Sequence, residues 1–168
     1  MHFRKTTSQM KKLSILLLLF ISTASFSQTQ LKSFDELMTA LKAGKNVKAV
    51  IYYAKCKLFS DGVEEAESPN AIGGMAFNTY EYFDTSVFKG KRPSFVTTSE
   101  TVLINHRFYG YVNNYVKLRV NIDNSIEITA QYLKNRKFSA KYKVVMDETF
   151  KGTINDGTND AGVYLYAE

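Results

Sequence analysis

The stretch FYGYVNNYVKLRVNIDNSIEITAQYL, residues 108–133, decides the fold class. Five apolar residues of its first half occupy even-numbered positions: Val112, Val116, Leu118, Val120 and Ile122. A period of two places apolar side chains on one face of a strand, and the same alternation returns after residue 125. The turn-forming segment DNS at 123–125 separates the two halves. The stretch therefore predicts an antiparallel β-hairpin.

Several flanking segments share the enrichment in β-branched and aromatic residues that is typical of strands. They are residues 46–56, 75–84, 94–104, 140–150 and 161–168. With the hairpin they predict an antiparallel meander sheet of six or seven strands. The periodicity leaves open whether this sheet closes into a barrel.

One amphipathic helix is predicted near the N-terminus, in LKSFDELMTALKAGKN (31–46). Ser33 is a candidate N-cap, Glu36 follows three residues later as in a capping box, and Gly44 suits the C-terminal end. The apolar residues recur with helical spacing: Phe34, Leu37, Met38 and Leu41. The predicted class is therefore α+β, mostly β, with the helix covering an open face or plugging an end.

The first 27 residues have the pattern of a secretory signal peptide. Four basic residues precede LSILLLLFIS, an apolar run of about 10 residues, and small residues follow it. We expect cleavage after Ser27, one domain over residues 28–168, and an exported protein that is periplasmic or secreted. The apolar run is too short to span a bilayer, so no membrane insertion of the mature chain is expected.

The predicted cleavage changes the charge of the chain. The whole sequence has 22 basic and 16 acidic residues, a net charge of +6. Residues 1–27 hold four basic and no acidic residues, so the mature chain has 22 − 4 = 18 basic residues and a net charge of +2. A balance this close to neutral gives no support to nucleic-acid binding.

Four stretches, the last of them within the hairpin, carry a family resemblance: LMTALKAGKNVKAVIYYAKC, GGMAFNTYEYF, FVTTSETV and YVKLRVNIDNSIEIT. In this order, and after a leader, they resemble the VirK family of small exported bacterial proteins. The resemblance covers nearly all of residues 28–168. It implies a fold type and an exported location, and it implies no particular reaction or ligand.

Cys56 is the single cysteine of the chain. Between Lys55 and Lys57 an exposed thiol would have a lowered pKa, which favours a reactive thiol or an intermolecular disulfide. A cysteine in a β-strand is more often a small buried residue. With one cysteine and one histidine in the mature chain, we expect no zinc site and no cofactor.

Two groups of oxygen-bearing side chains are candidate sites. Residues 54–77 contain Glu64, Glu65 and Glu67, which are candidates for acid–base chemistry, although Pro69 and Gly73–Gly74 favour a mobile connection between strands. Asp156, Thr158 and Asp160 alternate in INDGTNDAG as calcium ligands could, although this composition is equally that of a turn.

The tyrosines supply the strongest candidate binding surface. They form three i, i+2 pairs: Tyr80 with Tyr82, Tyr109 with Tyr111, and Tyr164 with Tyr166. On a strand each pair shares a face, so the three pairs are candidates for an aromatic face. The alternative is cross-strand packing within the sheet.

These observations lead to one principal functional prediction and two alternatives. The principal one is a non-enzymatic exported binding domain for an unknown protein, peptide or small-molecule ligand. The first alternative is a small hydrolase that uses carboxylates, with Glu64, Glu65, Asp147 and Glu148 as candidates. The second is a structural module tuned by calcium.

Overall fold

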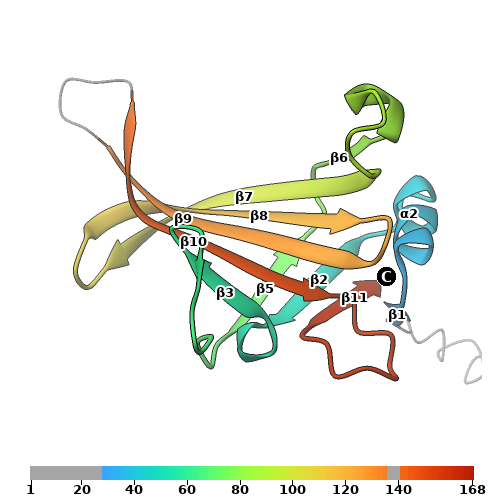
Figure 1. The fold of residues 1–168 in the computed structure, drawn as a ribbon, viewed down its shortest axis with the longest axis horizontal. Coiled ribbons are helices and arrows are strands. Elements are labelled where there is room, and N and C mark those ends of the chain that lie inside the picture. Colours follow the sequence, from blue (N-terminus) through green and yellow to red (C-terminus); the bar gives the residue numbers. More distant parts are fainter. Residues whose placement is uncertain (1–27, 136–140) are drawn as a thin grey trace, which may run out of the picture.

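The computed structural model describes residues 28–135 and 141–168 as two antiparallel β-sheets with one α-helix (Figure 1). The small sheet has the order β1 (Thr29–Leu31), β11 (Val163–Ala167), β2 (Val47–Tyr52), β5 (Ile72–Ala76). The large sheet has the order β4 (Val63–Glu64), β3 (Lys57–Ser60), β10 (Tyr142–Thr153), β9 (Ser125–Asn135), β8 (Gly110–Asn121), β7 (Phe95–His106), β6 (Tyr80–Phe83). The helix is α2 (Phe34–Lys42), and two 3-10 turns are η1 (Tyr53–Lys55) and η2 (Thr85–Phe88). The mostly β, α+β class is confirmed, and neither sheet closes into a barrel.

The predicted hairpin is formed by β8 and β9. Val120 lies opposite Ile126, and Asn124 has the left-handed φ of 67° that the turn requires. The backbone N–H of Ser125 donates to the Asp123 carboxylate (3.0 Å), which fixes the turn. Ile122 does not join the buried face, because β8 ends one residue before it.

Two of the predicted strands are interrupted where the chain passes from one sheet to the other. The segment 46–56 forms β2 in the small sheet and then leaves it through η1, so that the chain can enter the large sheet as β3. The segment 75–84 contains the end of β5 and, after the 77–79 bend, β6. The described residues form eleven strands rather than the predicted six or seven. Of the additional strands, β1, β3 and β4 lie in segments without a predicted strand, and the segment 75–84 is divided between β5 and β6.

Residues 54–77, predicted to be a mobile connection between strands, themselves contain the strands β3, β4 and β5, so the prediction of a connection without strands is wrong. The two glycines belong to β5. Gly73 lies opposite Ile51 and Gly74 opposite Val50 in a regular ladder. Gly73 instead leaves room for the ring of Tyr53, which a β-carbon at this position would meet at 2.8 Å.

The core lies between the two sheets. Ile51 and Leu165 of the small sheet are buried, as are Leu118 and Ile128 of the large sheet, and these residues belong to one hydrophobic cluster. Burial of this continuous apolar area is the main force that holds the sheets together.

Helix α2 closes one end of this sandwich (Figure 1). Its N-terminal Phe34 N–H donates to the Asn124 side chain in the β8–β9 turn (2.7 Å). Its C-terminal Leu41 carbonyl accepts from the Tyr80 hydroxyl of β6 (3.1 Å). Both helix ends are thus bound to the large sheet.

The predicted helix caps are largely confirmed. The Ser33 hydroxyl accepts the Glu36 N–H (3.2 Å), and Gly44 has a φ of 71° after the last turn. The Glu36 carboxylate accepts from the N–H of Lys32 (2.7 Å) rather than from that of Ser33, so the capping box is displaced by one residue.

The large sheet extends well beyond the small one (Figure 1). Strands β7 to β10 have 11 or 12 residues each, whereas the strands of the small sheet have 3 to 6. We call the projecting part the distal end, and it comprises residues 101–115, 131–135 and 141–145. Its base adjoins the small sheet, since Val102 and Asn114 line a hollow together with Gly73 and Gly74. On its outer face, as along the rest of the large sheet, the side chains point away from the small sheet.

Candidate functional site

The three tyrosine pairs lie on three separate parts of the structure. Tyr80 lies opposite Thr98 of β7, whereas Tyr111 lies opposite Asn105, seven residues further along the same strand. At roughly 3.3 Å per residue this places the first two pairs about 23 Å apart. The third pair belongs to the small sheet. The expected single aromatic face is therefore not formed.

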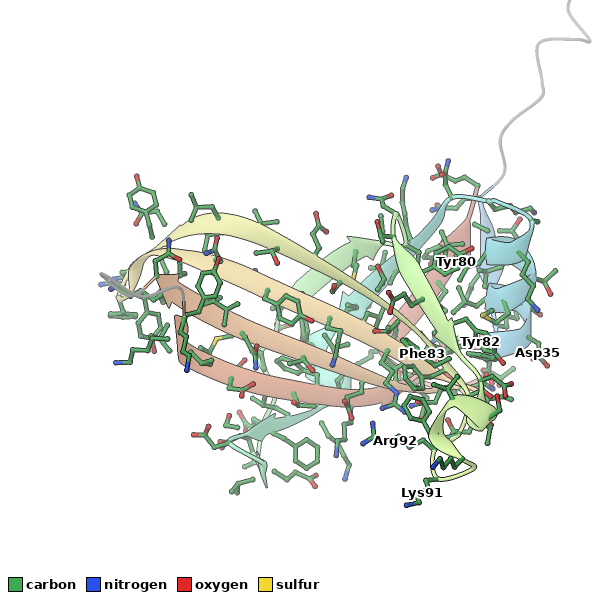
Figure 2. The ribbon with its side chains drawn as sticks, turned by 90° about the horizontal axis from the view of Figure 1, so that it is seen from above. Asp35, Tyr80, Tyr82, Phe83, Lys91 and Arg92 are labelled. Atoms are coloured by element: carbon green, nitrogen blue, oxygen red, sulfur yellow. The ribbon has the colours of Figure 1, made fainter. Side chains whose placement is uncertain are left out.

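The pair on β6 is part of the helix attachment. Figure 2 shows Tyr80 and Tyr82 beside α2, at the end of the molecule opposite the β7–β8 turn. The Tyr80 hydroxyl donates to the Leu41 carbonyl, and the Tyr82 hydroxyl donates to the Asp84 carboxylate (3.3 Å). The Tyr80 hydroxyl thus helps to hold α2 against the large sheet.

The pair on β11 lies on the outer face of the small sheet. The rings of Tyr164 and Tyr166 stack at 6.4 Å, and Tyr52 of β2 meets Tyr164 edge to face at 5.5 Å. These contacts correspond to the alternative of packing within the sheet.

Tyr109 and Tyr111 belong to the distal end but do not share a face. Tyr109 lies in the β7–β8 turn, where its ring stacks on His106 at 4.9 Å and meets Tyr132 at 6.1 Å. We call His106, Tyr109 and Tyr132 the tip cluster. Beside it Val112 is only 1% exposed although it lies outside the main core. Tyr111, on the strand itself, is 71% exposed.

Tyr111 is one of several large apolar side chains that the distal end exposes. In the strand register Leu103 of β7, Leu133 of β9 and Val144 of β10 fall in one cross-strand row, with Asn113 of β8 between them. The exposed members of the distal end are Val102, Leu103, Phe108, Tyr111, Tyr142 and Val144. Phe108, at the turn, is 79% exposed and Leu103 is 64% exposed.

The charged residues of the distal end are all basic: Arg107, Lys134, Lys141 and Lys143, each exposed. The three segments that compose it contain no Asp or Glu. Lys134 and Lys143 lie directly opposite each other on β9 and β10. The Lys134 ammonium donates to the carbonyl of Tyr109 (2.9 Å).

Sequence reasoning identified Tyr109 and Tyr111 but missed the other apolar and basic residues of the distal end. The alternation in residues 101–105 indicates a strand. It does not indicate that this strand extends beyond the small sheet. The absence of acidic residues from 101–115 and from 131–146 was a visible signal for this surface.

Cys56 has the environment of a core residue. It is 6% exposed, and its thiol lies 3.7 Å from the Tyr52 carbonyl. Burial raises the pKa of the Cys56 thiol, which opposes formation of the nucleophilic thiolate. The two lysines that could lower this pKa are bound elsewhere, Lys55 to Asp160 and Lys57 to Glu64. These contacts favour the packing interpretation.

A model of the VirK protein family matches residues 30–138. The chain belongs to the VirK family. The chain is also similar in structure to lpg1832, a VirK family protein from Legionella pneumophila, with a TM-score of 0.57 and 17% sequence identity. That similarity covers 81% of this chain and 97% of lpg1832, and at this identity it shows a shared fold. A search of curated proteins gave no match.

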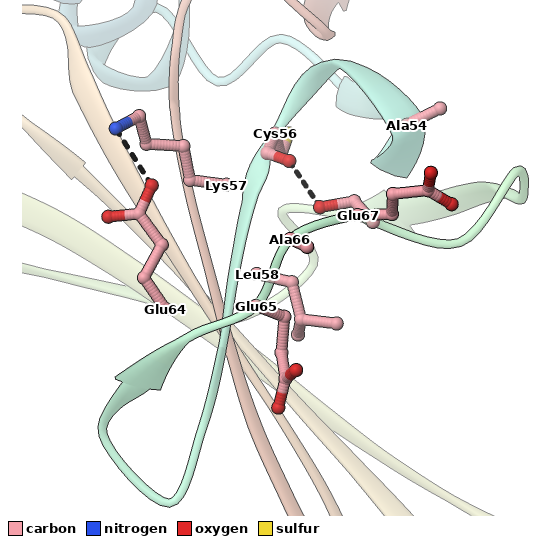
Figure 3. A pocket seen from close by; sticks show the side chains of 9 residues that line it. Ala54, Cys56, Lys57, Leu58, Glu64, Glu65, Ala66 and Glu67 are labelled. Carbon is pink, nitrogen blue, oxygen red and sulfur yellow. Dashed lines mark hydrogen bonds and ion pairs between the residues drawn. The ribbon is translucent and has the colours of Figure 1, made fainter.

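The carboxylates proposed for hydrolysis in this VirK family protein are mostly separated. Glu64 pairs with Lys57 (2.9 Å), and Figure 3 shows Glu64, Glu65 and Glu67 pointing in different directions around a hollow of about 350 Å³. Asp147 accepts a hydrogen bond from Gln131 (3.1 Å).

Glu148 is the exception among these carboxylates. Burial raises the pKa of Glu148, and the charge of Glu65 raises it further. A raised pKa is the direction that a general acid requires.

The candidate calcium ligands of the VirK domain are engaged with one another or with a lysine. The Asp156 carboxylate accepts from the Thr158 N–H and hydroxyl, both at 2.8 Å, and from the Asn159 N–H (3.0 Å). These bonds lower the pKa of Asp156. Asp160 is paired with Lys55. Within residues 28–135 and 141–168 no three His, Cys, Asp or Glu side chains converge as metal ligands.

In the part of the VirK chain that the structure describes, no helix has both the length and the apolar character needed to cross a membrane.

Proposed function

We propose that this VirK family protein is an exported, non-enzymatic binding domain whose recognition surface is the distal end of the large sheet. The observation that carries the proposal is the exposure of Leu103, Phe108 and Tyr111 on a part of the sheet that the core does not need. Large apolar side chains that gather on one exposed surface are typical of interaction sites.

Most of the distal end lies outside the buried core between the sheets. The buried cluster between the sheets includes Leu118 and Val120 of β8 but not Val112 or Tyr111, which lie further along the strand. The long strands therefore present side chains away from a core that is already complete. This arrangement supports a surface that serves a partner.

Export is the second part of the proposal. It is supported by the basic residues, apolar run and small residues of the first 27 positions, which lie outside the described residues. The lone buried Cys56 is compatible with an oxidising compartment, because it leaves no exposed thiol among the described residues.

Site-specific photo-cross-linking in intact cells tests the proposed surface. A benzophenone amino acid at Tyr111 should give a covalent adduct after irradiation, because this side chain would contact the partner. The matched control is the same substitution at Tyr82, which is 44% exposed at the opposite end. An absence of adducts at position 111, or equal adducts at both positions, would overturn the proposal.

A carboxylate-dependent hydrolase is the second candidate, favoured by the raised pKa of Glu148 and its proximity to Glu65. Its test is hydrolysis of chromogenic esters, glycosides and phosphates by the parent protein and by Glu148→Gln. The exposed Glu81→Gln is the control. A hydrolase is supported if the parent and Glu81→Gln turn over a substrate that Glu148→Gln does not. A parent without turnover rejects it.

A further inference from the structure

We propose that the distal end docks on a membrane surface rich in anionic phospholipid. This inference rests on the proposed function, because it names the partner of the same surface. It requires no spanning segment, since side chains of the distal end would enter the headgroup region while the sandwich remains in water.

The apolar part of the surface lies on one face of three strands. The register places Leu103 and Val144 in one cross-strand row, and Tyr111 and Tyr142 project from the same face closer to the strand ends. Phe108 extends beyond them at the turn. Aliphatic side chains gain free energy on leaving water for the acyl boundary, and tyrosines favour the headgroup level, where the ring and the hydroxyl are both accommodated.

The basic part of the surface adjoins the apolar part. The Arg107 guanidinium lies 5.4 Å from the centre of the Phe108 ring, so a positive charge is located beside the most exposed apolar residue. Lys and Arg have apolar stems that allow their charged groups to reach phosphates while neighbouring side chains are inserted more deeply.

The opposed lysines give an independent reason to expect an anionic partner. Lys134 and Lys143 face each other across β9 and β10, on the sheet face opposite to that of Leu103 and Val144, so a docked membrane would meet the end of the sheet where both faces terminate. Like charges in this position repel. The segments of the distal end supply no carboxylate to offset this repulsion. A layer of lipid phosphates would offset the repulsion. Each basic side chain near the membrane surface would raise the affinity of the protein for the membrane about fivefold.

A lipid surface explains the two properties together better than other anions do. A nucleic acid would bind the basic residues and stack on tyrosines, but it would gain little from the aliphatic Leu103 and Val144. The basic η2 region makes a useful contrast, because Lys91 and Arg92 follow the acidic residues Glu81 and Asp84 in the sequence. Among the described residues, the distal end combines exposed aliphatic side chains with basic side chains, and its own segments contain no acidic residue.

Vesicle co-sedimentation tests the inference with protein purified from the exported fraction of expressing cells. One set of vesicles is pure phosphatidylcholine, and the other has equal parts of phosphatidylcholine and phosphatidylglycerol. We expect binding to the anionic vesicles, weak binding to the neutral ones, and weaker binding at high salt.

Two variants and their matched controls locate the bound surface. Arg107→Gln with Lys143→Gln should weaken binding about 25-fold, at about fivefold for each charge. Phe108→Ser should weaken it at least about tenfold through lost apolar transfer. The controls remove the same charge and a similar apolar group elsewhere: Lys45→Gln with Lys91→Gln, and Val87→Ser. They should bind as the parent does.

Failure to bind anionic vesicles, or equal losses in the controls, would overturn the lipid inference. Binding to soluble polyphosphate but not to vesicles would also overturn it and indicate an anionic polymer. A protein adduct at position 111 without vesicle binding would preserve the proposed binding function while rejecting lipid as the partner. Loss of both the adduct and vesicle binding would reject both proposals.

Discussion

Gly73 allows an aromatic ring to pack against a strand of the small sheet. A β-carbon at this position would lie 2.8 Å from Cε2 of Tyr53. The Tyr53 ring is confined, because it packs on Phe150 with 4.6 Å between ring centres. We expect Gly73→Ala to lower the free energy of unfolding by about 1–3 kcal/mol in urea denaturation.

The adjacent glycine is the control for this substitution. A β-carbon on Gly74 would lie 3.6 Å from the Ala49 carbonyl oxygen, an ordinary contact distance. Gly74→Ala should therefore change the free energy of unfolding by less than about 0.5 kcal/mol. Equal losses in the two variants would show that the Tyr53 contact is not the cause.

Glu148 should make the stability of the fold depend on pH. Burial, and then the charge of Glu65, raises the pKa of Glu148 above its unfolded value. Its contribution to stability is therefore fully present below the unfolded pKa, near about 4.3, and is lost as the pH rises through the folded pKa.

Replacement of Glu148 by glutamine removes this titration. Glu148→Gln should be more stable than the parent at neutral pH, and this advantage should disappear in acid, where the parent carboxyl is also neutral. Urea midpoints of both proteins across this pH range measure the effect, with Glu67→Gln as the control for loss of one carboxylate. A constant difference at every pH would contradict the assigned cause.

At the scale of elements, helix α2 is held at its C-terminal end by one tyrosine hydroxyl. Tyr80→Phe removes the donor to the Leu41 carbonyl and should cost about 1 kcal/mol of unfolding free energy. Tyr82→Phe is the matched control, because its hydroxyl bonds to the exposed Asp84. Equal stability of the two variants in urea denaturation would show that the Tyr80 bond does not fasten the helix.

The helix could be predicted from the sequence, whereas the division of the strands could not. The cap of Ser33 and the turn residue Gly44 act within a few residues of the helix, so local chemistry identifies them. The break after Tyr52 depends instead on distant partners, since the Tyr53 N–H donates to the carbonyl of Ala71. The alternation of apolar residues along a strand does not indicate such contacts between distant parts of the chain.

At the scale of the whole molecule, alternation predicts which residues face a core but not which sheet covers them. Val112 and Leu118 lie on one face of β8, as the sequence predicts, and both are buried. Leu118 is covered in the inter-sheet core, while Val112 lies by the tip cluster. Tyr111 lies on the opposite face of β8 from Val112 and Leu118, so the alternation itself predicts that its side chain points away from the small sheet. The alternation could not predict that Val112 is buried outside the inter-sheet core.

Val112 and Leu118 therefore belong to units that should open separately. Leu118→Ala should lower the free energy of global unfolding by about 2–5 kcal/mol, because it leaves a cavity in the shared core. In hydrogen exchange it should expose amides of β2 and β11 while leaving the distal end unchanged, since the distal end can open without disturbing Leu118.

Val112→Ala should have the complementary effect on exchange. Loss of its methyl groups should accelerate exchange at the distal end about tenfold, by weakening the packing beside the tip cluster. If Leu118→Ala accelerates exchange at the distal end as much as in β2, the distal end exchanges only through global unfolding. The large sheet would then be one cooperative unit, and the distal end could not rearrange on a partner without loss of the core.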